Sequence, residues 1–145
     1  MRTVRMTGTY KADMSEIDGV YSLISSSLAG SGAPESAARL LEMAADEIFS
    51  NIVNYGYGDS RDGGRIDVSS EVRDGVAEIT FSDDGVPFDP LSKAPPDTGA
   101  GADERPIGGL GIYIVRNSVD AIDYSREDGH NILTLKKRIY DRLSG

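Results

Sequence analysis

LEMAADEIFSNIVNYGY, residues 41–57, carries the clearest structural signal in this sequence. We expect a helix over about 35–55, because apolar residues recur there at helical spacing: Leu41, Ala45, Ile48 and Ile52. At roughly 100° per residue, Glu47, Asn51 and Asn54 fall on a line beside this apolar stripe. The stretch therefore predicts an amphipathic helix with polar groups at the edge of the core, a position that often lines a cleft.

Strand and helix signals alternate on either side of this helix. Alternation predicts strands at 2–9, 65–72, 76–82, about 121–126 and 131–138, and apolar spacing predicts helices at about 13–29 and after the GGLG segment. Asp-Gly steps at 74–75 and 128–129 favour hairpin turns. No internal repeat or second domain is visible, so we expect one α+β domain over 1–145. Its helices would cover one face of a mixed, mainly antiparallel sheet.

The composition disfavours several classes of protein. The 145 residues include no cysteine, which excludes disulfides and thiolate metal sites and suits a reducing cytoplasm. Twenty-four acidic and 15 basic residues give a net charge of −9, which disfavours nucleic acid as a partner. This charge either steers a basic protein partner or simply maintains solubility. The opening MRTVRMTGTY lacks the apolar run of a signal peptide or membrane span, so we expect a soluble, cytoplasmic protein without a membrane partner.

Glu47 and Asn51 form the first of three segments that could carry chemistry. They lie four residues apart on a helix, so they share one face. The neutral amide oxygen of Asn51 suits a hard cation such as Mg²⁺, and the carboxylate of Glu47 can accept a proton from a nucleophile. Taken alone, the pair is better explained as a solvated polar stripe.

The second segment is DDGVPFD, residues 83–89. The preceding strand places its apolar residues on one face, and Asp83 continues that register. A carboxylate at the end of a buried face needs a hydrogen-bond donor, such as the exocyclic amine of a purine. Gly85 would let the backbone turn tightly against a flat base. An ordinary Asp-Asp-Gly turn is an equally good explanation of this segment alone.

The third segment comprises Gly108, Gly109, Leu110 and Gly111, at the start of an apolar helix. Backbone N–H groups at a glycine-rich helix start form an anion cradle, although a plain tight turn is the alternative. No Lys-Ser pair follows, which excludes a Walker A loop, and no strand–GxGxxG–helix unit opens the chain. Residues 91–108 are rich in Pro, Gly and Ala without periodicity, which predicts either a lid or a surface insertion.

The order and spacing of these segments resemble the gyrase, chaperone, histidine-kinase and mismatch-repair (GHKL) ATPase superfamily. LEMAADEIFSNIVNYGY, FSDDGVPFDP and GGLGIYIVRNSVD match its N box and its first and second glycine boxes in turn. Within the superfamily the chain looks most like the anti-sigma-factor serine kinases, from the N-terminal strand to about Arg138. The resemblance implies a two-layer α/β sandwich of the Bergerat type.

The resemblance also implies a role for each matched residue. Glu47 would be the general base, and Asn51 would coordinate the Mg²⁺ that bridges the ATP phosphates. Asp83 would accept the adenine amino group, with Gly85 giving the base room. The phosphates would be held by the second glycine box, which comprises Gly108, Gly109, Leu110 and Gly111. Arg105, at the end of the lid, could reach the terminal phosphate.

The implied function is that of an ATP-dependent serine-protein kinase acting as an anti-sigma factor. A kinase of this family acts as a homodimer. It binds a sigma factor and phosphorylates a serine of an anti-anti-sigma (STAS-type) protein, and it thereby regulates transcription in a stress response. A nucleotide-gated binding module without phosphotransfer is the alternative. Pro87 replaces a superfamily glycine, and Tyr55 replaces a His or Lys that contacts phosphate. Because of these departures, ATP binding is a firmer expectation than catalysis.

Overall fold

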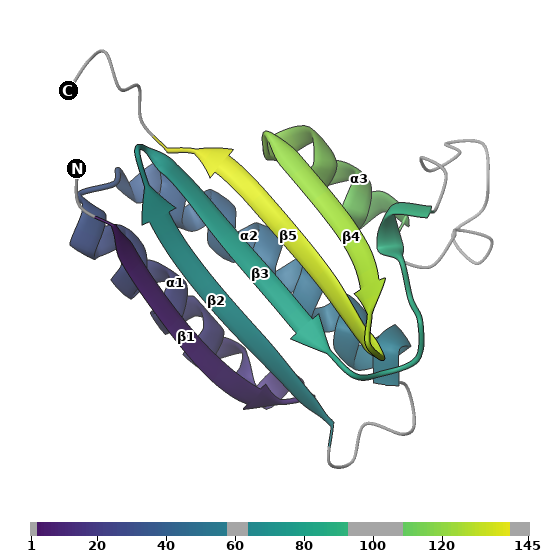
Figure 1. The fold of residues 1–145 in the computed structure, drawn as a ribbon. Coiled ribbons are helices and arrows are strands. Elements are labelled where there is room, and N and C mark those ends of the chain that lie inside the picture. Colours follow the sequence, from purple (N-terminus) through teal and green to yellow (C-terminus); the bar gives the residue numbers. More distant parts are fainter. Residues whose placement is uncertain (1–2, 58–63, 93–108, 140–145) are drawn as a thin grey trace.

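The computed structural model describes residues 3–57, 64–92 and 109–139, which form two layers (Figure 1). One layer is a sheet with the strand order β1-β2-β3-β5-β4, in which each strand of the described chain runs antiparallel to its neighbours. Its strands are β1 (Val4–Lys11), β2 (Arg65–Arg73), β3 (Val76–Asp83), β4 (Ala121–Glu127) and β5 (His130–Arg138). The other layer lies against one face of the sheet and contains α1 (Ile17–Ser31), α2 (Glu35–Asn51) and α3 (Gly109–Ser118).

Two hairpins set the register of the sheet. β2 and β3 are joined at Asp74 and Gly75, with φ of 54° and 80°, and β4 and β5 at Asp128 and Gly129, with φ of 51° and 80°. Two consecutive left-handed residues match the twist of the flanking strands, and Asp-Gly is a preferred pair for such a turn. The resulting register directs alternate residues of β2 and β3 into the core, as the sequence pattern predicts.

The core lies between the sheet and the helices. Large side chains from both layers are fully buried there, among them Ile24, Leu41, Phe49, Ile79 and Phe81. A polar contact also crosses the layers, because the hydroxyls of Ser27 on α1 and Ser70 on β2 are buried 2.6 Å apart. Each helix in the part of the chain that the structure describes is too short or too polar to span a bilayer.

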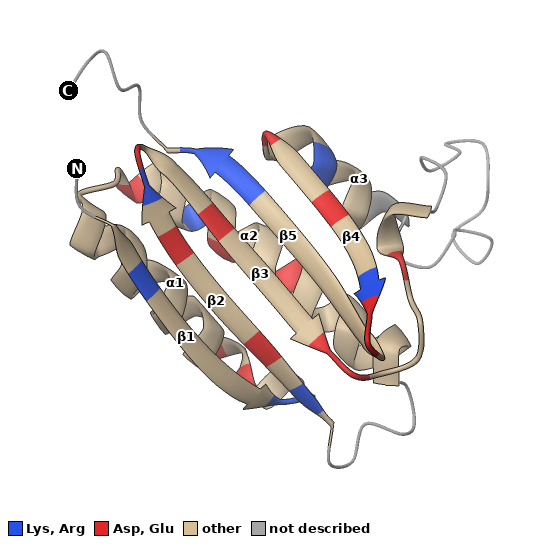
Figure 2. Cartoon of the chain, in the orientation of Figure 1, with Lys and Arg blue, Asp and Glu red and all other residues tan. Residues whose placement is uncertain are grey.

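The two faces of the molecule differ in charge. The strands carry both acidic and basic residues (Figure 2). On the sheet face away from the helices, ion pairs join neighbouring strands, for example Arg5 to Glu71 at 3.8 Å and Lys136 to Glu78 at 4.0 Å. The helical layer is acidic instead. Residues 12–57 contain seven acidic residues and one basic residue, a balance of −6.

The structure confirms the predicted α+β class and the helices on one face, with two differences in detail. The sheet is antiparallel in every described pair rather than mixed. The helix predicted over 35–55 ends as an α-helix at Asn51 and continues as a π-helical turn, Ile52–Tyr57. The predicted lid, 91–108, lies outside the described residues from residue 93 onward.

Candidate functional site

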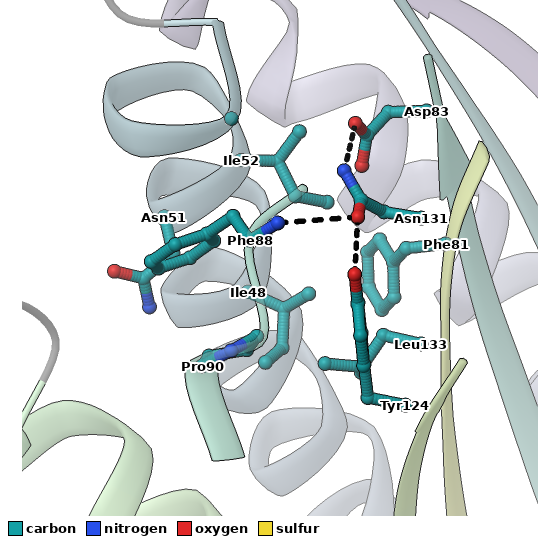
Figure 3. Close-up of a pocket in the computed structure, with 11 residues that line it drawn as sticks. Ile48, Asn51, Ile52, Phe81, Asp83, Phe88, Pro90, Tyr124, Asn131 and Leu133 are labelled. Carbon is teal, nitrogen blue, oxygen red and sulfur yellow. Dashed lines mark hydrogen bonds between the residues drawn. The ribbon is translucent and has the colours of Figure 1, made fainter. Parts of the chain in front are cut away.

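A pocket lies between α2 and the ends of β3, β4 and β5 (Figure 3). Its apolar walls are formed by Ile48, Ile52, Phe81, Phe88, Pro90 and Leu133. Its polar side chains are Asn51, Asp83, Tyr124 and Asn131. The pocket is narrow in this conformation, with room for about one water molecule. A flat ligand the size of a purine base therefore does not fit the pocket in this conformation.

Asp83 is the last residue of β3 and one of the polar groups of this pocket. Its side chain is only 3% exposed, because it continues the buried face of the strand as the alternation predicts. Its Oδ1 atom accepts hydrogen bonds from the backbone N–H of Gly85 at 2.9 Å and from Nδ2 of Asn131 at 3.0 Å. Burial raises the pKa of Asp83, and these two hydrogen bonds partly offset that rise. Among the described residues no hydrogen-bond donor engages the other oxygen, Oδ2, so this atom is the one available to a ligand.

Gly85 follows Asp83 in a loop that is docked on the π-helical turn. The N–H of Val86 donates to the carbonyl oxygen of Gly56 at 2.9 Å. A Cβ atom on Gly85 would overlap that oxygen and lie 2.8 Å from the carbonyl carbon of Gly56. A glycine is therefore required at position 85 by close backbone approach. Single π-helical turns often occur at functional sites, and here the turn supplies the Gly56 carbonyl that holds the loop.

Tyr57, the last residue of the π-helical turn, holds the same loop from its other side. Its hydroxyl accepts from the N–H of Asp84 at 3.1 Å and lies within donating distance of two oxygens, Oδ1 of Asp84 at 2.7 Å and the carbonyl oxygen of Arg65 at 2.6 Å. The hydrogen bond from Tyr57 lowers the pKa of Asp84, while burial raises the pKa of Tyr57. The loop after β3 is thus fixed by contacts to backbone and side chain on the turn.

Glu47 and Asn51 are coupled on α2, as their spacing predicts. Asn51 is buried, and its Nδ2 donates to Oε2 of Glu47 at 2.7 Å. The Glu47 carboxylate lies directly against Gly111 in the first turn of α3, where any Cβ would overlap it. A carboxylate is favourable at that position, because a helix N-terminus carries partial positive charge. The same helix end can bind other anions.

Several residues on the predicted list lie at one end of the molecule, between α2, the loop after β3 and the start of α3. Glu47, Asn51, Asp83, Gly85 and Gly111 are brought together there. Gly109 and Leu110 begin α3, whereas Arg105 and Gly108 lie outside the described residues.

Asn54 and Tyr55 occupy positions that the helical pattern did not foresee. Asn54 is exposed rather than at the edge of the core, because it lies in the π-helical turn, where 100° spacing no longer applies. The Tyr55 ring packs on Phe88, with ring centroids 5.7 Å apart. Tyr55 therefore supports the segment after Gly85 in this conformation.

The sequence pattern did not identify Asn131 and Tyr124 as residues of the site. Asn131 shares the inward face of β5 with Leu133 and Leu135, so the period of two could have identified a buried amide. Tyr124 on β4 donates its hydroxyl hydrogen to Oδ1 of Asn131 (Figure 3). Neither residue belongs to a glycine box or to the N box.

The oxygen atoms in this site fit Mg²⁺ better than a metal ion that takes all of its ligands from the protein. Among the described residues, no three His, Cys, Asp or Glu side chains come together to hold a metal ion. Mg²⁺ usually binds through one or two protein oxygens and keeps waters and substrate phosphates as its other ligands. Because Nδ2 of Asn51 is engaged by Glu47, the amide oxygen is the atom that can serve a cation.

Comparisons with known proteins find similarity over most of this chain. Residues 10–137 match the family model of the histidine kinase-like ATPase domain. The serine/threonine-protein kinase BtrW of Bordetella bronchiseptica is 30% identical over 97 residues, 66% of each chain. The serine-protein kinase RsbW of Listeria monocytogenes is 27% identical over 100 residues, 66% of this chain and 63% of the relative.

The chain thus spans just under two thirds of the length of these curated relatives. Among solved structures, the RsbU and RsbW domains of a Mycobacterium tuberculosis protein superpose with a TM-score of 0.66 at 20% identity. That superposition covers 93% of this chain and 32% of the other, and it shows a common fold.

Proposed function

Because the chain belongs to the histidine kinase-like ATPase family and has serine-protein kinases among its relatives, we propose that it is an ATP-dependent serine-protein kinase that acts as an anti-sigma factor. One observation carries the proposal: the buried carboxylate of Asp83, the hydrogen-bonded pair Glu47 and Asn51, and the glycine-rich start of α3 lie together at one end of the molecule. Phosphoryl transfer depends mostly on positioning and charge neutralisation, so these parts are close to sufficient.

Nucleotide recognition is assigned to Asp83 and the second glycine box. The Oδ2 atom of Asp83 would accept a hydrogen bond from the adenine amino group, with Gly85 giving the base room. The phosphates would lie at the start of α3, held by Gly108, Gly109, Leu110 and Gly111. Arg105 would pair with the terminal phosphate.

Catalysis is assigned to Glu47 and Asn51. Glu47 would accept the proton of the attacking serine hydroxyl, and the 2.7 Å hydrogen bond from Asn51 fixes the orientation of its carboxylate. The amide oxygen of Asn51 would hold Mg²⁺, which supplies charge neutralisation at the phosphates when bound. Because the Glu47 carboxylate packs against Gly111, the base lies close to the helix start that would bind the phosphates.

The proposed protein partners are a sigma factor and an anti-anti-sigma protein of STAS type, bound by a homodimer of this chain. The negative charge of the helical layer supports a protein partner with a basic surface and disfavours direct contact with nucleic acid. A cytoplasmic location and a role in a stress response belong to the same proposal.

The test is phosphotransfer to a purified anti-anti-sigma protein from the same organism, followed by mass spectrometry of the acceptor serine. Wild-type protein with Mg²⁺-ATP should phosphorylate it, and Glu47→Gln should bind ATP but lose at least ~100-fold in rate. Glu42→Gln, on the same helix and outside the pocket, is the matched control and should retain full activity.

The same assay separates the kinase from a binding module. ATP binding together with equal, negligible phosphotransfer by wild type and Glu47→Gln would contradict the kinase assignment. That result would leave a nucleotide-gated binding module. Absence of ATP binding by wild type would overturn both.

A further inference from the structure

Asn131 is a buried amide whose nitrogen and oxygen are both fully engaged. Its side chain is among the buried polar groups of the molecule, with 5% exposure. Nδ2 donates to Oδ1 of Asp83 at 3.0 Å and to the carbonyl oxygen of Val86 at 2.8 Å. Oδ1 accepts from the N–H of Phe88 at 3.2 Å and from the hydroxyl of Tyr124 (Figure 3).

This network fixes which end of the amide faces Asp83. A flipped amide would place its oxygen against the Asp83 carboxylate and the Val86 carbonyl oxygen, and its NH₂ group against the N–H of Phe88, so these three contacts would be lost. The Tyr124 hydroxyl can donate or accept and so bonds either end of the amide. The backbone N–H of Phe88 and the backbone carbonyl of Val86 therefore hold Nδ2 toward Asp83, and the Tyr124 hydroxyl adds a hydrogen bond at the other end of the amide. Asp83 receives this donor and the Gly85 N–H on the same oxygen.

The consequence concerns the protonation state of Asp83. A carboxyl in a buried pocket with apolar walls tends to become neutral, and a neutral carboxyl can donate as well as accept. Two donors on Oδ1 favour the charged form, which can only accept.

Other groups facing Asp83 act in both directions. Arg126 on β4, whose guanidinium donates to the Gly85 carbonyl at 2.9 Å, favours the charged form, whereas Asp84 in the loop opposes it. The hydroxyls of Tyr57 and Tyr124 face it from the π-helical turn and β4, and α2 contributes the neutral Asn51 to the pocket.

We propose that Asn131 is a positioning residue that keeps Asp83 a pure hydrogen-bond acceptor, so that the pocket selects purines with an amino group at C6 over purines with an oxo group there. The proposal rests on the proposed function, which places the base of ATP in this pocket. An amino group donates to Oδ2, whereas an oxo group would set one acceptor against another. A buried site built for one hydrogen-bonding pattern rejects the other strongly, because a buried polar group is then left unpaired.

The experiment measures the dissociation constants of ATP and inosine triphosphate, whose base carries the 6-oxo group, by calorimetry with Mg²⁺. Wild type should bind inosine triphosphate at least ~100-fold more weakly than ATP. Asn131→Ala should reduce this ratio by at least ~10-fold, because Asp83 then takes up a proton more readily and donates to the oxo group. The ratio of this variant should also fall as the pH is lowered, more steeply than that of wild type, because burial raises the pKa of Asp83 and the variant lacks one of the donors that offset that rise.

Two further variants separate positioning from folding. Tyr124→Phe removes the hydroxyl that anchors the amide, which loosens the position of Asn131, and should reduce the ratio in the same direction by a smaller factor. Thr134→Val lies on β5 and loses a hydroxyl contact to Thr80 at 3.3 Å outside the pocket, so it should keep the wild-type ratio. If Asn131→Ala does not fold, Tyr124→Phe decides alone.

Three results would overturn the inference. In the first, both nucleotides weaken by equal factors in Asn131→Ala and Tyr124→Phe, which leaves Asn131 a structural role alone. In the second, wild type binds ATP and inosine triphosphate equally, which removes the selectivity but leaves the proposed function intact. In the third, wild type binds neither nucleotide, which overturns the proposed function itself.

Discussion

Gly85→Ala should distort the site, because the added methyl group would clash with the backbone of Gly56. The added Cβ would overlap the carbonyl oxygen of Gly56 and lie 2.8 Å from its carbonyl carbon. Both are backbone atoms, so no flexible side chain can move aside. The loop must shift away from the π-helical turn, and the 2.9 Å hydrogen bond from Val86 N–H to Gly56 is lost with it.

The expected magnitude follows from these two effects. Overpacking of this kind costs about 1–3 kcal/mol, and a lost intramolecular hydrogen bond costs about 0.5–1.5 kcal/mol. The free energy of unfolding should therefore fall by about 2–4 kcal/mol. Because the loop also places the donor to Asp83, the affinity for Mg²⁺-ATP should fall by at least ~10-fold, which is about 1.4 kcal/mol.

Urea unfolding and calorimetric titration of Mg²⁺-ATP measure the two effects. Gly30→Ala is the matched control, because the nearest atom to its added Cβ is a methyl carbon of Val4 at 3.4 Å, an ordinary contact. Within α1 this change should stabilise the protein by up to about 1 kcal/mol and leave ATP affinity unchanged. If Gly85→Ala matched wild type in both stability and affinity, the docked loop could not be part of the site.

Two further changes test the contacts on either side of the site. Gly111→Ala should displace the Glu47 carboxylate from the start of α3 and lower the phosphotransfer rate by at least ~10-fold in single-turnover assays. An unchanged rate would mean that catalysis by Glu47 does not depend on its contact with Gly111. Ser27→Ala should leave the Ser70 hydroxyl buried without its partner and lower the free energy of unfolding by about 1–2 kcal/mol in urea. Adding Ser70→Ala should recover part of that loss, and purely additive losses would contradict the coupling.

The sequence predicts those features of this protein that depend on short-range periodicity. The period of two extends the buried face of β3 to Asp83, and Asp-Gly steps occur at both left-handed turns. The four-residue spacing of Glu47 and Asn51 likewise corresponds to a direct hydrogen bond.

Features that depend on contacts between distant segments could not be predicted in this way. The π-helical turn is stabilised where the Gly56 carbonyl meets Val86, a contact that the local sequence does not encode. Asn131 forms hydrogen bonds with groups on β3, on β4 and in the loop after β3. Such a network exists only once the fold has brought those segments together.

Asp83→Asn offers a clean separation of binding from folding. The folded-state pKa of Asp83 is raised above its unfolded value, so its charged form costs stability at neutral pH, and that cost is relieved as pH falls through the folded pKa. Asparagine is uncharged and keeps an oxygen that can accept from Gly85 and Asn131. The variant should therefore be at least as stable as wild type at neutral pH in urea unfolding.

The most direct test of the account is calorimetric titration of Mg²⁺-ATP into the wild-type protein and into Asp83→Asn. The account predicts saturable binding by wild type and a loss of at least ~100-fold in affinity for the folded variant, since its amide presents a donor to the adenine amino group. Equal binding by the two proteins, or no binding by wild type, would contradict the assignment of this pocket to the nucleotide base.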